Sequence, residues 1–184
     1  NSVLNTMKQR NILTPILRVN TDAGNHSLFV SGQKIDYGAY DNKVLPERIY
    51  DRTGNSYVES IHVLTYDSKG RPTETVNVKT GVHTAYRWDN DFNYLLIKAE
   101  NATLQELNSA YSSSTTGNGI LDNLPNAMVQ IWHYRPHVGV TEHTDPSGMT
   151  MQYEYDPLGR LIKASRVASG STEVLQEYTY TYPN

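Results

Sequence analysis

Alternating apolar and polar side chains predict a strand over residues 149–155. A period of two is typical of a strand that buries one face. The apolar and polar positions of this segment are Met149, Met151, Tyr153 and Tyr155 against Thr150, Gln152 and Glu154. Segments 82–88 and 174–182 alternate in the same way. We therefore expect a sheet built from short strands.

Turn sequences bracket residues 149–155 on both sides. Asp145-Pro146-Ser147-Gly148 precedes the segment and Asp156-Pro157-Leu158-Gly159 follows it. Proline suits the fixed φ of a turn, and glycine suits a position that needs positive φ. Gly170 follows Gly159 at the same interval of 11 residues. A turn signal that returns at a fixed interval indicates a meander of hairpins, and we take 11 residues as the hairpin length.

Copies of the turn occur earlier in the chain. Residues 66–71, Tyr-Asp-Ser-Lys-Gly-Arg, parallel residues 155–160, Tyr-Asp-Pro-Leu-Gly-Arg. A weaker copy is found at residues 50–54, and residues 88–95 look like a longer version without glycine. The aspartates of these copies are Asp51, Asp67, Asp89 and Asp156. Their recurrence favours a structural role, in which each carboxylate accepts backbone N–H groups of its turn.

One segment changes to helical spacing. Leu104, Leu107 and Tyr111 repeat every three or four residues, and residues 103–106 match a capping box. We expect one short helix here, then a mobile polar stretch at 112–119 and a helical turn at 120–124. The chain is predicted to be a single block, with a first hairpin set at 1–98, a helical and flexible insert at 99–126, and a second hairpin set at 127–184.

Composition and charge exclude several classes of protein. The chain of 184 residues has 16 basic and 19 acidic side chains, a net charge of −3, and no cysteine. Nothing resembles the basic footprint of a nucleic-acid-binding protein, and thiolate metal sites and disulfides are excluded. No apolar run is long enough to cross a bilayer. Tyrosine is abundant, with 14 residues against two Phe and two Trp, as suits half-buried sheet faces.

Candidate chemistry is weak in this sequence. His133 and His137 have the spacing of a zinc pair on a helix, but Pro136 and the apolar flanks predict a bent strand. In the cluster 142–145, Asp145 is expected to cap the turn rather than to act as an acid or base. Neither a serine-nucleophile motif nor a phosphate-binding loop occurs. We expect no enzyme, no cofactor and no metal site.

The Tyr-Asp-x-x-Gly-Arg sequences resemble the YD repeat of the Rhs family. An ordered set of further segments looks like the C-terminal YD block of the large exported Rhs-like proteins of Bacteroidetes, and this resemblance covers nearly the whole chain. The segments are 7–15, 66–67, 86–88, 99–103, 134–141, 144–145 and 153–156. Self-cleavage, known for some members, is not carried over, because the second Asp-Pro copy of their motif is missing after Leu161.

The resemblance implies a mainly β fold, an antiparallel ribbon of hairpins forming a curved, shell-like sheet. It also implies a segment of a larger polypeptide, which is extracellular or on a cell surface and encloses or presents a toxin domain. The remainder of that polypeptide would be its main partner. The residues expected to build the repeat turns are Tyr66, Asp67, Gly70, Arg71, Asp145, Gly148, Tyr155, Asp156, Gly159 and Arg160.

A binding module for a glycan or a protein is the alternative function. Trp88, Tyr153, Tyr178 and Tyr180 are its candidate contact residues. The competing interpretation is that these rings pack across strands within the sheet. Exposure of the tyrosines separates the two. We also expect edge strands of this chain to self-associate, because an unpaired edge is a template for another strand.

Overall fold

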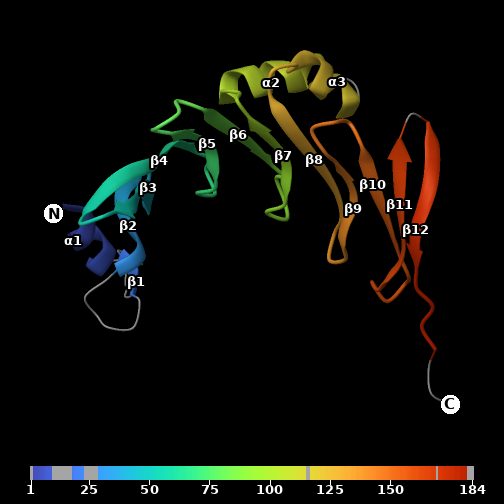
Figure 1. Cartoon of the computed structure of the whole chain (residues 1–184), viewed down its shortest axis with the longest axis horizontal. Coiled ribbons are helices and arrows are strands. Elements are labelled where there is room, and N and C mark those ends of the chain that lie inside the picture. The colour runs from blue at the N-terminus through green and yellow to red at the C-terminus, as the bar shows by residue number, and fades with distance from the viewer. Residues whose placement is uncertain (1, 10–17, 23–28, 115–116, 169, 182–184) are drawn as a thin grey trace. The chain divides into compact units, whose positions relative to one another are not determined.

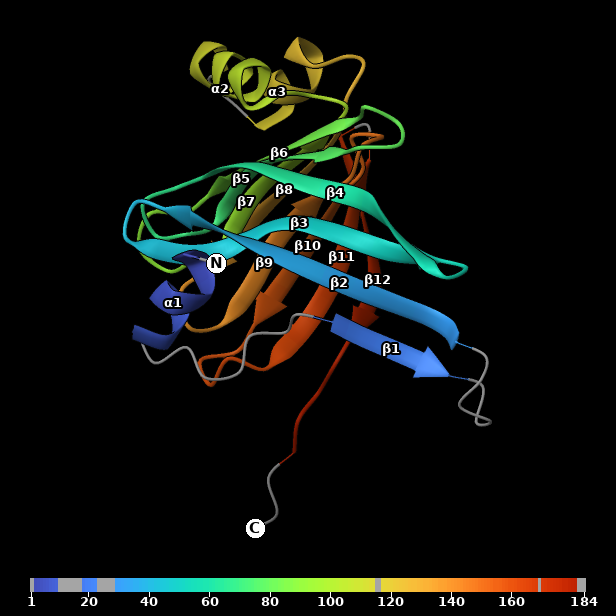
Figure 2. The same ribbon diagram turned by 90° about the vertical axis from the view of Figure 1, so that its left-hand side faces the viewer.

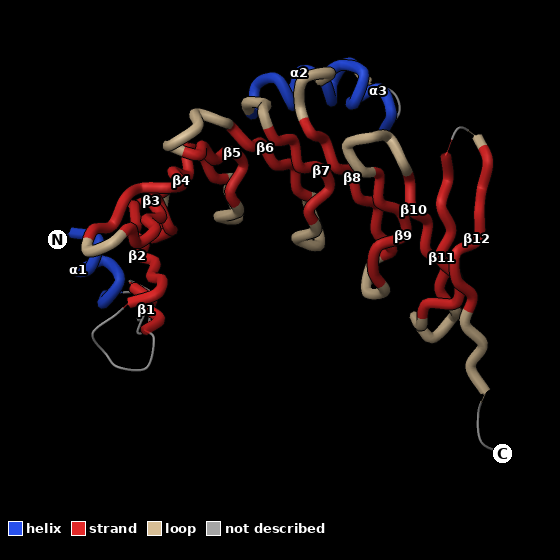
Figure 3. The backbone as a smooth tube through the Cα atoms, in the orientation of Figure 1, coloured by secondary structure: helices blue, strands red, loops and turns tan. Residues whose placement is uncertain are grey.

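The computed structural model describes residues 2–9, 18–22, 29–114, 117–168 and 170–181. The chain divides into two compact units, Asn1–His83 and Thr84–Asn184. Strands dominate both units, and helices occur near the N-terminus and within the second unit (Figure 3). The expected fold class, mainly β with antiparallel hairpins, is confirmed in each unit.

The first unit is an antiparallel meander preceded by a helix (Figure 1). Each strand pairs with its neighbours in the sequence, from the first strand to the fifth. The elements are α1 (Ser2–Gln9), β1 (Arg18–Asp22), β2 (Phe29–Tyr40), β3 (Lys43–Thr53), β4 (Ser56–Tyr66) and β5 (Pro72–Asn77).

The second unit continues the same architecture with shorter strands. Its strands again pair in sequence order, and all of the pairs are antiparallel. Its elements are β6 (His83–Trp88), β7 (Leu95–Glu100), α2 (Leu104–Ser113), α3 (Gly117–Asn123), β8 (Met128–Arg135), β9 (Gly139–Thr144), β10 (Thr150–Tyr155), β11 (Leu161–Ala168) and β12 (Ser171–Glu177). Figure 2 shows these strands twisting together as one sheet within the unit.

Successive turns lie at opposite ends of the strands, which corrects the expected hairpin length. Gly148 lies between β9 and β10, Gly159 between β10 and β11, and Gly170 between β11 and β12. The interval of 11 residues is therefore one strand plus one turn, and two intervals make a full hairpin.

The main core of the second unit lies between the sheet and the two inserted helices. Ile97 pairs with Ile131, and Ala99 with Ala85 and Val129, so these five side chains share one face of β6, β7 and β8. They form a buried cluster with Leu107 and Ala110 of α2, Ile120 of α3, and Leu124 directly after α3. Figure 1 shows α2 and α3 beside these strands. Burial of apolar area is the main force that fixes the insert to the sheet.

Helix α2 begins where the sequence predicts. Thr103 Oγ1 accepts a hydrogen bond from the Glu106 N–H, and the Glu106 carboxylate accepts one from the Thr103 N–H at 2.8 Å. This reciprocal pair satisfies two N–H groups that have no partner within the helix. Near the C-terminal end of α2, the Tyr111 ring lies 3.6 Å from the Arg87 guanidinium of β6. This cation–π contact joins the helix to the strand.

Helices cover more of the insert than the sequence suggests. We expected one helix, a mobile stretch at 112–119 and a helical turn at 120–124. Within the described residues, the insert holds two helices, and Ser112–Ser113 and Gly117–Gly119 belong to them, while residues 115–116 lie outside the description. Ile120 and Leu124 are buried at 4% and 9% exposure. These two side chains tie the polar stretch to the core, which its own composition did not reveal.

The N-terminal region departs from the sequence expectations at α1. The sequence analysis predicts no helix over Ser2–Gln9, whereas the structure has α1 there, with Met7 buried at 2% exposure. The expected family segment 7–15 lies mostly outside the described residues.

Candidate functional site

The Tyr-Asp turn between β4 and β5 is organised by one carboxylate. Asp67 Oδ1 accepts the N–H groups of Lys69 and Arg71, both at 2.9 Å. Asp67 Oδ2 accepts Arg71 Nε at 2.6 Å. The Gly70 N–H donates to the Asp67 carbonyl at 2.9 Å, and Gly70 has a φ of 86°. This is a three-residue hairpin loop with a left-handed residue at its end, and the aspartate holds both of its sides.

The turn between β10 and β11 repeats this geometry. Asp156 Oδ1 accepts the N–H groups of Leu158 and Arg160, both at 2.9 Å, and Oδ2 accepts Arg160 Nε at 2.7 Å. Gly159 has a φ of 78°. The two turns therefore agree in hydrogen-bond pattern and in arginine contact, although the two residues between the aspartate and the glycine differ.

The turn between β9 and β10 uses the same plan without arginine. Asp145 Oδ1 accepts the Ser147 N–H at 2.8 Å, the Ser147 hydroxyl at 2.6 Å and the Met149 N–H at 3.1 Å. Gly148 has a φ of 84°. A serine hydroxyl therefore takes the place of the guanidinium as the side-chain donor.

Two further turns are longer by one residue. Asn77 Oδ1 accepts the N–H groups of Lys79 and Thr80, and the Asn77 N–H donates to the Val82 carbonyl at 2.9 Å. Asp89 Oδ1 likewise accepts the N–H groups of Asp91 and Phe92. The left-handed position is Gly81 in the first case and Asn93, with a φ of 63°, in the second. Asparagine tolerates this conformation, which explains the turn without glycine.

The weak copy at residues 50–54 is not a turn of this kind. Asp51 lies inside β3, opposite Val58 of β4, and Gln33 Nε2 donates to Asp51 Oδ1 at 3.3 Å. Thr53 pairs with Ser56, so Gly54 and Asn55 alone make a two-residue hairpin loop. The expected correspondence of Asp51 with the other aspartates is wrong, because the shorter loop leaves this carboxylate in the strand.

The pKa values of three turn aspartates lie below the ordinary range. Partial burial raises the pKa of Asp67, but hydrogen bonds from Arg71 and Lys69 and the Arg71 charge outweigh it. Hydrogen bonds from Ser147 are the main cause for Asp145, and the backbone N–H of Arg160 is the main cause for Asp156. The turns therefore bind the ionised carboxylate.

In the two Tyr-Asp turns, the tyrosine reaches back to the preceding strand. Tyr66 OH donates to the Pro46 carbonyl of β3, and Tyr155 OH donates to the Val140 carbonyl of β9 at 2.7 Å. Burial raises the pKa of Tyr66 to about 12. A Cβ at Gly139 would lie 3.1 Å from the Tyr155 hydroxyl, so glycine leaves the space in which the tyrosine crosses the β8–β9 hairpin.

Removing this hydroxyl should weaken the second unit measurably. We expect Tyr155→Phe to lower the free energy of unfolding by about 1 kcal/mol, because the Val140 carbonyl loses a protein donor. Tyr153→Phe, two residues earlier in the same strand, is the matched control and should change it by less than about 0.5 kcal/mol. Urea unfolding followed by tryptophan fluorescence measures both, since Trp88 and Trp132 lie in this unit. Equal losses would contradict the anchoring role of Tyr155.

A row of contacts joins the hairpin ends at one side of the second unit. The Tyr94 ring stacks on Tyr134 with centroids 4.5 Å apart, and Tyr94 OH accepts the His137 N–H at 3.2 Å. Arg135 Nη2 donates to the Asp156 carbonyl at 3.2 Å, and its guanidinium lies 5.7 Å from the Tyr155 ring centre. Sequence reasoning missed this row, which we call the turn ladder. The sequence places Tyr94 in the turn at 88–95 and Tyr134 in a later strand, but it gives no register between the strands that follow and contain them.

The aromatic residues named as glycan or partner contacts do not gather at one place. Trp88 and Tyr153 are partly buried in β6 and β10. Tyr178 and Tyr180 follow β12 and are 37% and 41% exposed. Five strands lie between β6, which holds Trp88, and β12. Because neighbouring strands are about 4.8 Å apart in a sheet, Trp88 is far from β12. Tyr180 is also engaged internally, because its hydroxyl donates to the Leu161 carbonyl at 2.9 Å and Arg160 lies over its ring.

The histidines also remain apart. His133 in β8 lies 3.9 Å from Glu142, measured from Nε2 to Oε1, whereas His137 lies in the β8–β9 turn with its ring against Phe92. His143 stacks on Trp132 with centroids 5.0 Å apart. Among the residues that the structure describes, no three His, Cys, Asp or Glu side chains form a group that could hold a metal ion. The same part of the chain contains no helix long and apolar enough to cross a membrane.

Residues 138–172 match the RHS repeat family model. This segment begins in the β8–β9 turn and contains the Asp145 and Asp156 turns together with Tyr155. Among curated proteins, none matches the chain.

Solved structures of the TcdB2–TccC3 proteins have a similar fold. The crystal structure of TcdB2–TccC3 with Cdc42 superposes with a TM-score of 0.55 at 10% identity, covering 97% of this chain and 10% of that one. The structure without the hypervariable C-terminal region gives a TM-score of 0.56 with the same identity and coverage. At this identity the likeness concerns the fold. The chain spans about a tenth of the length of these structures.

Proposed function

We propose that this chain is a non-catalytic structural segment of a YD-repeat shell or extracellular scaffold. The RHS repeat match and the fold shared with TcdB2–TccC3 support a structural Rhs-type segment. The finer proposal is that the whole polypeptide is exported, is of the Bacteroidetes type, and encloses or presents a toxin or effector domain. Its remaining repeats would be the main partner of this segment.

The repeated use of one turn geometry carries this proposal. The carboxylates of Asp67, Asp145 and Asp156 each accept backbone hydrogen bonds from their own loop. The Asp145 and Asp156 turns lie at opposite ends of β10, a six-residue strand, and are separated by roughly 20 Å at the usual rise per residue. Catalysis needs ionisable groups that converge on a substrate, whereas these carboxylates each specify one hairpin. We therefore propose the turn residues as structural devices.

The outer edge of β12 is the proposed junction with the next hairpin of a longer polypeptide. All seven residues of β12 are exposed, in contrast to the strands that have a neighbour on each side. Hydrogen exchange should show fast exchange for alternate β12 amides in this chain and slow exchange in a longer polypeptide that contains it. Amides of β8, which pairs with both β7 and β9, should be protected in both. Equally fast exchange of β12 in both samples would contradict the proposal.

The same edge predicts self-association of the isolated chain. Val174 and Leu175 are 47% and 49% exposed on β12, and an apolar unpaired edge favours pairing with a second copy. Sedimentation velocity should show concentration-dependent dimers, and Val174→Lys with Leu175→Lys should abolish them. Val58→Lys, at a residue 41% exposed in β4, is the control and should leave association unchanged. A strict monomer at high concentration would contradict this prediction.

The alternative function, a surface binding module, is favoured by one observation. Tyr178 and Tyr180 keep more than a third of their surface in solvent, as a stacking platform for a glycan requires. Trp88 and Tyr153 are partly buried in β6 and β10. Further hairpins beyond β12 would cover these tyrosines, so the scaffold remains our first proposal.

A further inference from the structure

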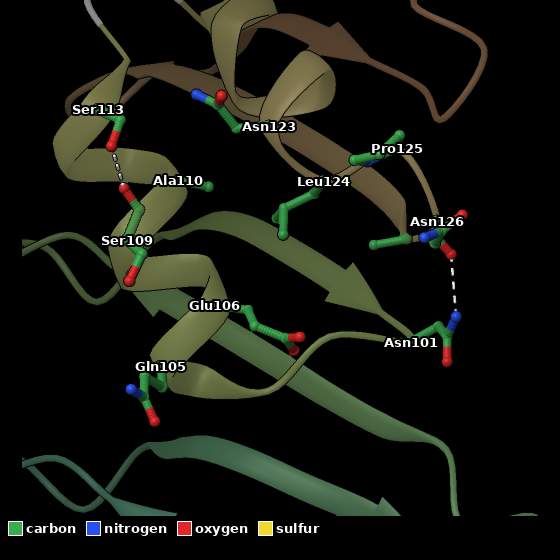
Figure 4. Close-up of a pocket in the computed structure, with 11 residues that line it drawn as sticks. Asn101, Gln105, Glu106, Ser109, Ala110, Ser113, Asn123, Leu124, Pro125 and Asn126 are labelled. Atoms are coloured by element: carbon green, nitrogen blue, oxygen red, sulfur yellow. Dashed lines mark hydrogen bonds between the residues drawn. The ribbon is translucent and has the colours of Figure 1, made fainter.

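We propose that the groove between α2 and the segment from Leu124 to Ala127 binds a neutral saccharide. The groove has a volume of about 480 Å³, which lies within the range of small-molecule sites. Figure 4 shows α2 along one side and the loop with Pro125 and Asn126 along the other. No residue of the Tyr-Asp turns lines this groove, so the proposal does not depend on the scaffold function.

The chemistry of the walls selects a neutral polar ligand. Amides and hydroxyls dominate the lining, which includes Gln105, Ser109, Asn123 and Asn126. Among the lining residues, none is Lys, Arg or His, and Glu106 is the single acid. A phosphate or carboxylate would find no cation here, and a metal ion would find one carboxylate where several oxygen ligands are needed.

The floor of the groove is small and apolar. Ala110 and Leu124 are 4% and 9% exposed, and Figure 4 shows Leu124 projecting into the space between the helix and the loop. A sugar ring presents C–H groups on its faces and hydroxyls around its rim. An apolar floor with polar walls matches this distribution, because the C–H groups leave water while each hydroxyl finds a donor or an acceptor.

Backbone hydrogen bonding argues against a peptide as the ligand. The Leu124 N–H donates to the Leu121 carbonyl at 3.2 Å, and the Ala127 N–H donates to the Leu124 carbonyl at 3.0 Å. The Asn126 carbonyl accepts Asn101 Nδ2 at 3.0 Å. These main-chain groups are satisfied internally, so an extended peptide could not add to the loop as a strand does to a sheet edge. A ligand in the groove would therefore be bound by the side chains of the lining residues.

The walls are held in place before any ligand binds. Glu106 is fixed by Thr103, whose N–H and hydroxyl both lie 2.8 Å from its Oε2 atom. The Ser113 hydroxyl donates to the Ser109 carbonyl at 2.9 Å, and Asn123 Nδ2 donates to the Ser114 hydroxyl at 3.0 Å. A wall that is already ordered loses little conformational entropy on binding.

Saturation-transfer NMR on the whole chain tests the proposal. The probes are glucose, galactose, mannose and N-acetylglucosamine, each at millimolar concentration, with a neutral tetrapeptide of alanine and serine as comparison. We expect saturation transfer to at least one sugar and none to the peptide. Absence of transfer to all four sugars, or transfer to the peptide alone, would overturn the assignment.

Variants locate the binding. Gln105→Ala with Ser109→Ala should weaken sugar binding at least tenfold, and alanine suits both helix positions, so α2 is preserved. Ser112→Ala is the matched control, since Ser112 is an exposed α2 serine outside the groove lining, and it should leave binding unchanged. Unaltered sugar binding by the double variant would overturn the proposed site, and circular dichroism checks that all variants keep the same helix content.

Discussion

Leu107→Ala should lower the free energy of unfolding of the second unit by about 3 kcal/mol, the largest effect expected from a single side chain here. Leu107 is 0% exposed and packs among Ala110, Ile97 and Val129 in the core between α2 and the sheet. Truncation removes buried methyl groups and leaves a cavity that the surrounding small alanines cannot fill. The insert should therefore loosen from the strands.

Urea unfolding followed by tryptophan fluorescence measures this effect, because both tryptophans lie in the second unit. Leu158→Ala is the control, since Leu158 is 69% exposed and its truncation should change stability by less than about 0.5 kcal/mol. A loss below about 1 kcal/mol for Leu107→Ala would mean that the insert does not share the core of the sheet.

Asp67→Ala should destabilise the first unit by about 2–3 kcal/mol, because one carboxylate accepts three hydrogen bonds within the β4–β5 turn, including one from Arg71. Asp67→Asn keeps one acceptor oxygen and should cost about half as much. Asp51→Ala is the matched control: it removes the aspartate of a similar sequence that accepts no loop N–H, and should cost less than about 0.5 kcal/mol. Hydrogen exchange of β4 and β5 amides measures the three variants, and equal losses for Asp51 and Asp67 would contradict the role of the turn.

The same carboxylates predict a loss of stability in acid. The folded pKa values of Asp67, Asp145 and Asp156 are lowered, whereas an unfolded aspartate titrates near about 3.9. Their contribution is therefore complete above the unfolded pKa and is lost as the pH falls through the folded values. Unfolding free energy should be flat above about pH 5 and fall below about pH 4. Asp67→Ala should make the fall in the first unit shallower, and an unchanged pH profile would count against ionised Asp67 as the stabilising form.

The elements that local chemistry specifies were predictable from the sequence. Asp156, Pro157 and Gly159 set the loop that joins β10 to β11 through contacts within five residues, and Thr103 with Glu106 sets the start of α2 in the same way. Alternation over 149–155 identified β10 because one face of this strand is more buried than the other. Such features depend on neighbours in the chain, which the sequence displays directly.

Features that depend on distant contacts were missed. Asp51 has the local sequence of a turn, but the pairing of β3 with β4 sets a two-residue loop and leaves it in the strand. Residues 117–119 of the polar stretch belong to α3, and Ile120 and the following Leu124 are buried in the core with residues of β8 and α2. The turn ladder needs the register of β7 against β8, which brings Tyr94 onto Tyr134. No local pattern contains this register.

The most direct test of the proposed scaffold role is electron cryo-microscopy of a longer polypeptide that contains this chain. We predict that residues 1–184 form part of a continuous wall of hairpins, with a further strand paired to the outer edge of β12 and with Tyr178 and Tyr180 covered by it. A free-standing domain joined to the rest by a flexible linker, with the β12 edge and both tyrosines in solvent, would contradict the account and favour a binding module.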